Sequence, residues 1–309
     1  MAQPVSLTVG ILAYNCERTL PELLESLHAG LAGVDDWHLV IADGASTDGT
    51  LDAARRLAPE AGIVGLGANR GFAAAANAVI AADPSSEAVL ILSQTVRLTP
   101  GCVKLMLAAL DQPGVGIAVP RLLRGTGKPY PSLRRRPTLL RAWSEALIGG
   151  TIASRVPALS ELIAAPEAYS GQTRADWASG AVTLMSRDCL KQVGAWDERF
   201  FLYSEETDFE LRAGDAGFRL AFTDVNVIHL GGESRVRPDL WSLQCANKVR
   251  LYGMRHRRRP AEMFWAAVVL GEVLRALSRR TPIHRAAVTK LLRERQALIT
   301  GQLATSPRP

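Results

Sequence analysis

The sequence predicts an α/β fold, in which a mostly parallel, Rossmann-like sheet is flanked by helices and followed by a helical C-terminal extension. Short apolar runs alternate with helical patterns over the first 120 residues, and the links between them are short. Beyond residue 233 the pattern is helical only. Alternation of strands and helices with short links is typical of a parallel sheet with helices on both faces.

The predicted elements follow one another in order. Residues 5–13 form a short, mainly apolar run and predict a buried strand. Thr19 and Glu22 have the spacing of a capping box, and the leucines that follow at i, i+3, i+4 and i+7 predict an amphipathic helix. Further strands are expected over residues 37–42, 63–66, 89–92, 115–119 and 220–228. Further helices are expected over residues 50–57, 72–82, 103–110 and 139–148.

Four polar or Gly-rich segments follow predicted strands, at residues 13–15, 43–49, 67–72 and 93–95. The carboxyl ends of parallel strands meet at one edge of a sheet, and ligands of open α/β sheets bind beyond that edge. We therefore expect the ligand site among these four segments.

Two lone polar residues at strand ends each have two interpretations. The carboxylate of Asp43 can accept hydrogen bonds from a nucleobase or a ribose, or it can form the turn that follows. His229, next to two glycines, can bind a metal or a phosphate, although a lone His is more often structural.

Residues 65–71 superficially match a dinucleotide-binding turn, but their GxGxxxG spacing after the third strand argues against a nicotinamide enzyme.

The acidic stretch Glu205, Glu206 and Asp208 places three carboxylates within four positions. Mutual repulsion raises the pKa of at least one of them toward neutral, which suits a general base that deprotonates an alcohol. The same pattern is typical of a helix N-terminus, where carboxylates face the positive end of the macrodipole. The two interpretations are compatible.

The composition indicates a globular chain with a basic C-terminal part. Hydrophobic residues make up 48% and charged residues 21%, which argues against disorder. The four cysteines lie far apart without metal-ligand spacing, so we expect reduced thiols and no zinc site. The N-terminus shows no signal-peptide pattern.

The formal net charge is +6, yet residues 233–309 hold 16 Lys and Arg against 5 Asp and Glu.

This basic part predicts an anionic partner, unless it is simply a solvated helical surface. An Arg-rich cluster at residues 255–259 precedes an apolar helix that is too short to span a bilayer, a pattern that fits interfacial binding to anionic lipid. Packing of this helix on the rest of the protein fits equally. Nucleic acid is not expected as a partner, because no aromatic-rich RNA-reading motif is present.

Several ordered motifs carry a family resemblance: Leu12-Ala13-Tyr14-Asn15, residues 41–50 (IADGASTDGT), Asn69-Arg70-Gly71-Phe72 with Asn77, Trp177-Ala178-Ser179-Gly180, residues 194–201 (GAWDERFF), the acidic stretch and His229. Together they resemble an inverting family-2 glycosyltransferase of the GT-A fold, closest to the bacterial rhamnosyltransferase-like branch. The resemblance covers roughly residues 5–235.

The resemblance implies roles for individual residues. It implies a nucleotide-sugar site made of Tyr14, Asn15, Asp43, Asn69, Arg70, Gly71, Phe72, Asn77 and Thr95. It makes Glu206 the catalytic base, with Asp208 and Glu205 positioning it or binding acceptor hydroxyls. Trp177 and Gly180 are expected to border the acceptor, and His229 to approach the diphosphate or its metal.

One departure from the family pattern concerns the metal. The family has an Asp-x-Asp type motif after the fourth strand, and its carboxylate holds the divalent cation that bridges the diphosphate. The matching positions here are Ser93-Gln94-Thr95, whose neutral oxygens are weak partners for Mg²⁺ or Mn²⁺. Three outcomes stay open: a metal held through the diphosphate, His229 and water, replacement of its charge by Arg70 or Arg97, or a catalytically impaired protein.

The resemblance thus implies transfer of a sugar from dTDP-rhamnose or a UDP-sugar to a hydroxyl of a glycolipid or cell-surface polysaccharide precursor. The alternative is a nucleotide-sugar-binding or scaffold protein. The enzyme is expected in the cytoplasm, peripherally at the inner face of the cell membrane, with no oligomeric state specified. The expected organisation is a nucleotide-sugar-binding half (residues 1–120) and an acceptor-binding and catalytic half (121–232) of one domain, then a basic helical extension (233–309).

Overall fold

The computed structural model describes residues 5–169, 173–231, 237–279 and 281–302. The chain divides into two compact units, each assembled from segments that are discontinuous in the sequence. The first, the sheet unit, comprises Met1–Ser132, Pro166–Glu198 and Glu205–Gly231. The second, the helical unit, comprises Leu133–Ala165, Arg199–Ser204 and Gly232–Pro309.

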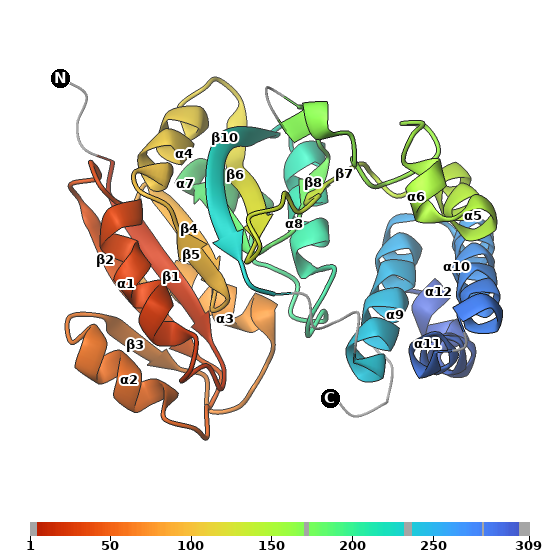
Figure 1. The fold of residues 1–309 in the computed structure, drawn as a ribbon, viewed down its shortest axis with the longest axis horizontal. Coiled ribbons are helices and arrows are strands. Elements are labelled where there is room, and N and C mark those ends of the chain that lie inside the picture. Colours follow the sequence, from red (N-terminus) through yellow and green to blue (C-terminus); the bar gives the residue numbers. More distant parts are fainter. Residues whose placement is uncertain (1–4, 170–172, 232–236, 280, 303–309) are drawn as a thin grey trace. The chain divides into compact units, whose positions relative to one another are not determined.

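The sheet unit is built on an eight-stranded sheet in the order β3-β2-β1-β4-β9-β6-β10-β5 (Figure 1). Its strands are β1 (Leu7–Ala13), β2 (Trp37–Asp43), β3 (Gly62–Gly65), β4 (Ala88–Ser93), β5 (Val96–Leu98), β6 (Val115–Arg124), β9 (Val182–Ser186) and β10 (Arg219–His229), with a short β8 (Trp177–Ala178) outside the sheet. Its helices are α1 (Leu20–Gly30), α2 (Thr50–Leu57), α3 (Phe72–Ala82), α4 (Cys102–Leu110), η1 (Pro166–Tyr169), α7 (Arg187–Val193) and α8 (Glu205–Asp215).

Most neighbouring strands run parallel. Strands β1 to β4 pair in parallel, as do β6 and β10. Strand β9 is antiparallel to β4 and β6, and β5 is antiparallel to β10. The prediction of a mostly parallel sheet flanked by helices is therefore confirmed.

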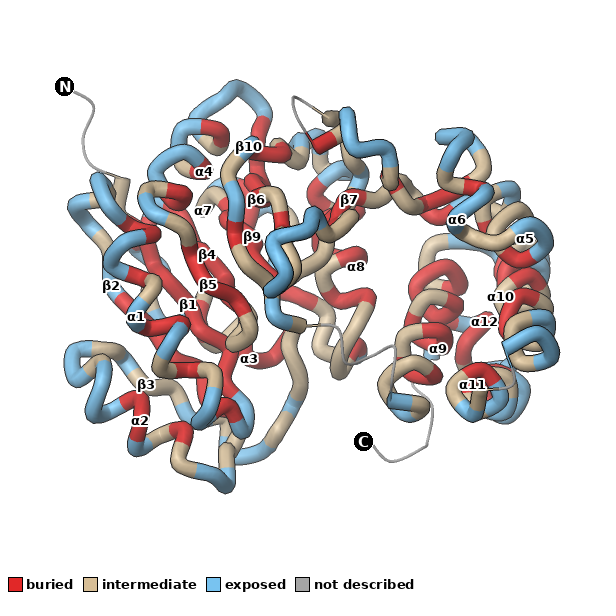
Figure 2. Tube along the Cα trace, viewed as in Figure 1, coloured by how far each residue is buried: buried red, intermediate tan, exposed pale blue. Residues whose placement is uncertain are grey.

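Successive residues of β1 face opposite helical layers, as the alternation of a strand requires. Leu7, Val9 and Ile11 belong to a buried core that includes the leucines of α1. Gly10 faces α3 instead, because a Cβ there would lie 2.3 Å from Cγ1 of Val79. Helices α1 and α3 thus cover opposite faces of the sheet, and its central strands are buried (Figure 2).

Two local features differ from the sequence expectation. Thr19 forms no capping box, because its hydroxyl donates to the Cys16 carbonyl at 3.4 Å and makes no cap hydrogen bond. Glu22, the expected partner, accepts a hydrogen bond from Arg97 at 2.8 Å. Strand β5 was not predicted, since three residues are too few to show a periodic pattern.

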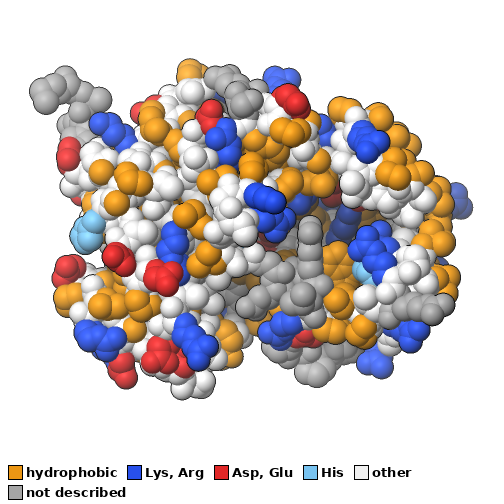
Figure 3. All heavy atoms as spheres, viewed as in Figure 1, with side chains coloured by type: hydrophobic (Ala, Val, Ile, Leu, Met, Phe, Trp, Pro, Cys, Tyr) orange, Lys and Arg blue, Asp and Glu red, His pale blue; other side chains and the backbone are white. Residues whose placement is uncertain are grey.

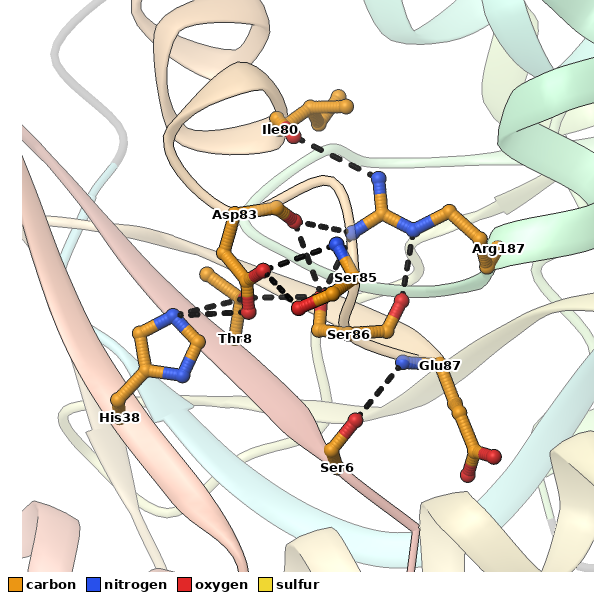
Figure 4. A network of polar contacts seen from close by, with 9 residues as sticks. All are labelled: Ser6, Thr8, His38, Ile80, Asp83, Ser85, Ser86, Glu87 and Arg187. Carbon is orange, nitrogen blue, oxygen red and sulfur yellow. Dashed lines mark hydrogen bonds and ion pairs between the residues drawn. The ribbon is translucent and has the colours of Figure 1, made fainter.

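A network of polar contacts lies at the amino ends of β1 and β2 (Figure 4). Arg187 donates to the carbonyls of Asp83 and Ser86, each at 2.7 Å, and so satisfies acceptors just beyond the end of α3. His38 Nε2 faces both the Thr8 hydroxyl, at 3.1 Å, and the Asp83 carboxylate, at 3.4 Å. These contacts of His38 join β1 and β2 to the turn that follows α3.

The helical unit consists of β7 (Leu133–Arg134), α5 (Leu139–Ile148), α6 (Gly150–Ala153), α9 (Pro238–Arg255), α10 (Arg258–Arg279), α11 (Pro282–Arg293) and α12 (Arg295–Ile299). Val249, Phe264 and Leu291 lie in its core and are fully buried. Gly271 allows α5 to approach α10, because a Cβ there would lie 3.3 Å from that of Ala146. The predicted helical extension is confirmed.

A buried carboxylate links three helices of this unit. Glu272 on α10 accepts hydrogen bonds from Trp241 (2.9 Å) and Arg275 (2.8 Å) and pairs with His284 Nδ1 (2.7 Å). Burial alone would raise the pKa of Glu272, but the charge of Arg275 and these hydrogen bonds outweigh it and hold that pKa below its ordinary value. The carboxylate therefore stays ionised and tied to its partners.

The four cysteines are free and buried, in agreement with the expectation of unpaired thiols. Within the ranges that the structure describes, no helix combines the length and the apolar character that crossing a membrane requires.

Candidate functional site

The loops after β1 and β2 are bonded to each other. Asp43, the last residue of β2, is 2% exposed, and its carboxylate accepts hydrogen bonds from the Ser46 backbone N–H (3.1 Å) and hydroxyl (2.5 Å). The Asn15 N–H donates to the Ser46 hydroxyl at 3.0 Å, and Oδ1 of Asn15 accepts from the Thr47 N–H at 2.8 Å. Asp43 thus forms the turn, and the structure brings it together with Asn15 and the exposed ring of Tyr14.

Backbone strain gathers at this edge and just before α8. Among the described residues, the non-glycine positions with positive φ are Asn15 (47°), Ala45 (62°), Tyr203 (68°) and Ser204 (75°). Each is, or lies within two residues of, a predicted site residue. Left-handed backbone at a non-glycine residue costs about 1–3 kcal/mol and persists where the surroundings enforce it, which is typical of functional loops.

The segment before α3 is fixed by its own side chains. Oδ1 of Asn69 accepts a hydrogen bond from the Gly71 N–H at 3.1 Å, and Gly71 has a φ of 91° that favours glycine. The guanidinium of Arg70 meets the carboxylate of Glu198 at 2.6 Å. Arg70 is therefore held in a defined direction while half of its side chain stays exposed.

Aromatic packing joins α3 to α8. The Trp196 ring is buried, stacks on Phe209 of α8 at 5.1 Å and lies 5.9 Å from Phe72 at the start of α3. Asn77 of α3 hydrogen-bonds to the backbone of Trp196 and to Glu198. The predicted diphosphate-side residues and the acidic helix thus belong to one packed cluster.

Helix α8 begins with Glu205 and Glu206. Glu205 is 4% exposed, and its Oε2 is buried without a hydrogen-bond partner among the described residues. Burial, reinforced by the neighbouring Glu206, raises the pKa of Glu205 well above its ordinary value. Gly180 lies against Glu206, because a Cβ there would lie 3.0 Å from the Glu206 Cβ. The structure therefore brings Gly180 and the acidic pair together.

The remaining carboxylates of α8 organise the backbone around them. Asp208 accepts a hydrogen bond from Arg212 at 2.7 Å, and Arg212 also donates to two carbonyls of residues 193–195. Glu210 is 2% exposed and accepts the Ala178 N–H at 2.5 Å, which holds β8, with Trp177, beside α8. Burial raises the pKa of Glu210 well above its ordinary value.

The expected metal position lies after β4. The hydroxyls of Ser93 and Thr95 are 3.1 Å apart, and Oε1 of Gln94 accepts a backbone N–H from the loop after β1 at 3.0 Å. His229 adjoins this position, since the N–H of the following residue donates to the Thr95 carbonyl at 2.9 Å. In the described parts of the chain, no three His, Cys, Asp or Glu side chains gather as a metal site. These neutral oxygens do not fit a cation held by carboxylates.

His229 is suited to hydrogen bonding in its neutral form. Burial, with a contribution from Arg124, lowers the pKa of His229. Its ring meets Tyr130 edge-on at 6.0 Å, and the Arg124 guanidinium lies over the Tyr130 ring at 4.9 Å. A neutral imidazole offers one donor and one acceptor, which suits contact with a diphosphate oxygen.

Arg97 is not available to replace the charge of a metal ion. Its Nε and Nη2 donate to Glu22 of α1 at 3.0 and 2.8 Å, and Nη1 donates to the Val96 carbonyl at 2.7 Å. The residue is 9% exposed. Of the two arginines considered as replacements for the metal charge, the structure leaves Arg70.

Sequence reasoning missed two acidic residues. Glu198 contacts both Arg70 and Asn77, across 128 and 121 positions, and no local pattern signals such a pairing. Glu210 follows Glu206 by four positions and therefore shares its helix face. That spacing was a usable signal for Glu210.

Residues 8–164 match the model of the family described as Glycosyl transferase family 2. An N-acetylglucosaminyl-diphospho-decaprenol L-rhamnosyltransferase of Mycobacterium tuberculosis is 30% identical over 210 residues, which span 62% of this chain and 66% of that relative.

Solved glycosyltransferases share the fold. The mannosyltransferase PcManGT from Pyrobaculum calidifontis, in complex with GDP-Man and Mn²⁺, superposes with a TM-score of 0.58 at 17% identity, covering 97% of this chain and 86% of that one. S. aureus TarS 1–349, in complex with UDP, superposes with a TM-score of 0.53 at 15% identity, covering 95% and 92%. The GT-A fold expected from the resemblance is confirmed. Because the family match covers more than half of the sequence, the chain belongs to glycosyl transferase family 2.

Proposed function

We propose that this protein transfers a sugar from a nucleoside-diphosphate-sugar to a hydroxyl of a lipid-linked acceptor, with inversion at the anomeric carbon. The donor class is dTDP-rhamnose or a UDP-sugar, and the acceptor is a glycolipid or polysaccharide precursor. The mycobacterial relative supports this proposal, since its name specifies L-rhamnosyl transfer and a diphospho-decaprenol compound. Such an acceptor suits a protein held peripherally at the inner face of the membrane through its basic C-terminal region.

The observation that carries the proposal is the buried acidic start of α8. Burial and the neighbouring Glu206 raise the pKa of Glu205 well above its ordinary value, and Glu206, the less buried member of the pair, is proposed as the base. Gly180 leaves room for the Glu206 side chain. Glu206 takes the proton of the acceptor hydroxyl, whose oxygen bonds to the anomeric carbon. The bond from that carbon to the diphosphate breaks, and its electron pair leaves with the nucleoside diphosphate.

The donor is proposed to lie along the carboxyl ends of β1, β2 and β4. The exposed ring of Tyr14 is available to the base, and the Asn15–Asp43 turn to the ribose. Arg70, held by Glu198, faces the diphosphate in this arrangement. Thr95 and His229 offer neutral hydrogen-bonding groups on the same side.

The test is a panel of dTDP-, UDP- and GDP-sugars, measured for binding and for transfer to a lipid-diphosphate acceptor. Glu206→Gln should keep donor affinity and lose transfer by about 10²–10⁴-fold. Glu25→Gln, an exposed carboxylate on α1, serves as the matched control and should retain transfer. Wild-type transfer by Glu206→Gln would exclude Glu206 as the base.

A second candidate is a nucleotide-sugar-binding protein without transferase activity. It is favoured by Ser93-Gln94-Thr95, which provides no carboxylate where the family has one. Tight donor binding without turnover, for every donor and acceptor in the panel, would support this candidate over the enzyme.

A further inference from the structure

The two units carry opposite net charges. The segments of the helical unit hold 22 Lys and Arg against 7 Asp and Glu, and those of the sheet unit hold 14 against 23. The formal net charges are therefore +15 and −9. Residues 133–165 contribute five arginines and two glutamates to this excess, so it extends beyond the C-terminal part of the chain.

The acidic side chains of the helical unit do not neutralise its surface. Each one that the structure describes is already paired with a cation of the same unit. Lys248 lies 2.8 Å from Glu161 and 3.5 Å from Glu145, and Arg275 lies 2.8 Å from Glu272. The other pairs are Asp239 with Arg237, Glu262 with Arg258, and Glu294 with Lys290. No described carboxylate of this unit is left over to balance its excess of cations.

Helix α10 presents an apolar stripe to solvent. Its members follow one another at spacings of three and four residues, which places them on one helix face: Met263, Ala266, Leu270, Leu274 and Leu277. Met263 is 50% exposed, Leu274 40% and Leu277 71%. Phe264 and Ala267 lie on the side of the helix that is buried in the core. The stripe is therefore not needed to hold the unit together.

Exposed apolar side chains also lie on α5, which packs against α10, and on α6 and the turn after it. Its members there are Leu140 (56% exposed), Leu147 (61%), Ile148 (44%), Ile152 (56%) and Val156 (47%). Figure 3 shows hydrophobic side chains gathered along this margin of the helical unit. These residues and the stripe form the apolar face. Exposed patches of this kind mark interaction sites.

Arginines stand beside the apolar face. Arg257 directly precedes α10, Arg259 lies in its first turn, four residues before Met263, and Arg155 lies in the turn after α6. All three are exposed, and none has an ion-pair partner among the described residues. Aliphatic side chains flanked by guanidinium groups are typical of surfaces that lie at the interface of an anionic bilayer.

We propose that the apolar face docks on an anionic lipid bilayer, with its leucines and isoleucines at the acyl boundary and its arginines at lipid phosphates. The proposal rests on the proposed function, which holds the protein at the membrane through its basic C-terminal region, and deepens it by assigning the contact to the apolar face. A second copy of the chain would bring two units of charge +15 together, which repel. A nucleic acid would engage the arginines and leave the leucines in water.

The experiment measures sedimentation of the full chain with vesicles. The wild type should bind vesicles of phosphatidylglycerol and phosphatidylcholine far better than vesicles of phosphatidylcholine alone, and binding should weaken as salt rises. The double variants Leu147→Ser/Ile152→Ser and Leu274→Ser/Leu277→Ser should each lower the partition coefficient at least about tenfold. Leu105→Ser, on α4 of the sheet unit, is the matched control, since Leu105 is 57% exposed against 56% for Ile152.

Wild-type vesicle binding by both double variants would overturn the proposal, and so would equal binding to neutral vesicles. Self-association or RNA binding that the double variants abolish, without vesicle binding by the wild type, would assign the face to another partner. Donor binding by calorimetry verifies the fold, and a double variant that fails this check is replaced by its two single variants. Vesicle binding without sugar transfer would refute the proposed function and leave the docking surface intact.

Discussion

Asn77 and Trp196 exchange two hydrogen bonds across 119 positions of sequence. The Trp196 N–H donates to Oδ1 of Asn77, and Nδ2 of Asn77 donates to the Trp196 carbonyl, each at 2.9 Å. A carboxamide satisfies a backbone donor and a backbone acceptor at once, because it carries both kinds of group. One side chain of α3 thereby fixes the turn that leads to the acidic helix.

We expect Asn77→Ala to lower the free energy of unfolding by about 1–3 kcal/mol, because two buried backbone groups lose their partners. Urea denaturation measures this change. Gln192→Ala is the control, since it removes an exposed hydrogen bond to the Ala216 carbonyl and should stay within about 0.5 kcal/mol of wild type. Equal unfolding midpoints for the two variants would contradict the expectation.

Arg187→Lys should also destabilise the fold, by about 1–3 kcal/mol, because an ammonium cannot reach all the acceptors of the planar guanidinium. Nucleotide affinity should not change, since this network lies at the amino ends of the strands, away from the ligand edge. Lys191→Ala, an exposed position on the same helix, controls for the loss of a surface cation. A change in nucleotide affinity comparable to the change in stability would refute this separation.

Glu210→Gln should make stability less dependent on pH. Burial raises the pKa of Glu210 in the folded state, so its stabilising contribution is full below the unfolded pKa of about 4.3 and is lost as pH rises toward the folded value. Glutamine keeps an oxygen for the Ala178 N–H and removes the ionisation. The variant should match wild type near pH 4 and exceed it near pH 8 in urea denaturation. A constant difference at all pH values would argue against a shifted carboxyl.

Arg70→Ala should weaken nucleoside diphosphate binding roughly tenfold, as the loss of a charge-assisted contact would. Arg97→Ala should lower stability and leave that affinity unchanged, because Arg97 is bound to Glu22. Glu198→Gln removes the ion-pair partner of Arg70 and keeps the Arg70 guanidinium. It therefore distinguishes loss of the partner from loss of Arg70 itself. Calorimetric titration measures all of these affinities.

We expect EDTA to leave the nucleoside diphosphate affinity of the wild type unchanged in the same titration, since neutral oxygens occupy the family's carboxylate position.

Local patterns predicted most elements, because the loops are short and the helices amphipathic. The bounds of α2, α3 and α5 coincide with the expected ranges. The two threonines before α1 and α5 show where local reasoning ends. Thr138 has extended backbone and accepts the Arg141 N–H at 3.3 Å, whereas Thr19 is helical and caps nothing. The difference depends on the path of the chain and on Arg97, which engages Glu22, and neither can be seen in a window of ten residues.

The sequence predicted the contents of the candidate site better than its bonding. Motif order and strand ends placed Asn15 beside Asp43, as the structure shows. The pairing of Arg70 with Glu198 depends on tertiary contacts between distant segments and could not be predicted. The basic excess was predicted only from residue 233 onward, since the arginines of residues 133–165 are distant from that part in the sequence and join the same unit only through tertiary contacts.

Strand β5 directly follows β4 in the chain, yet its neighbour in the sheet is β10, with Val96 opposite His229. On the ribosome, about 130 further residues must therefore be synthesised after β5 before its partner strand exists. At about 5–20 residues per second, this interval lasts roughly 7–25 s. During that time the nascent sheet exposes an open edge to chaperones and to other nascent chains. A chain released before residue 227 lacks the strand segment that covers β5, so folding of the sheet unit can finish only late in synthesis.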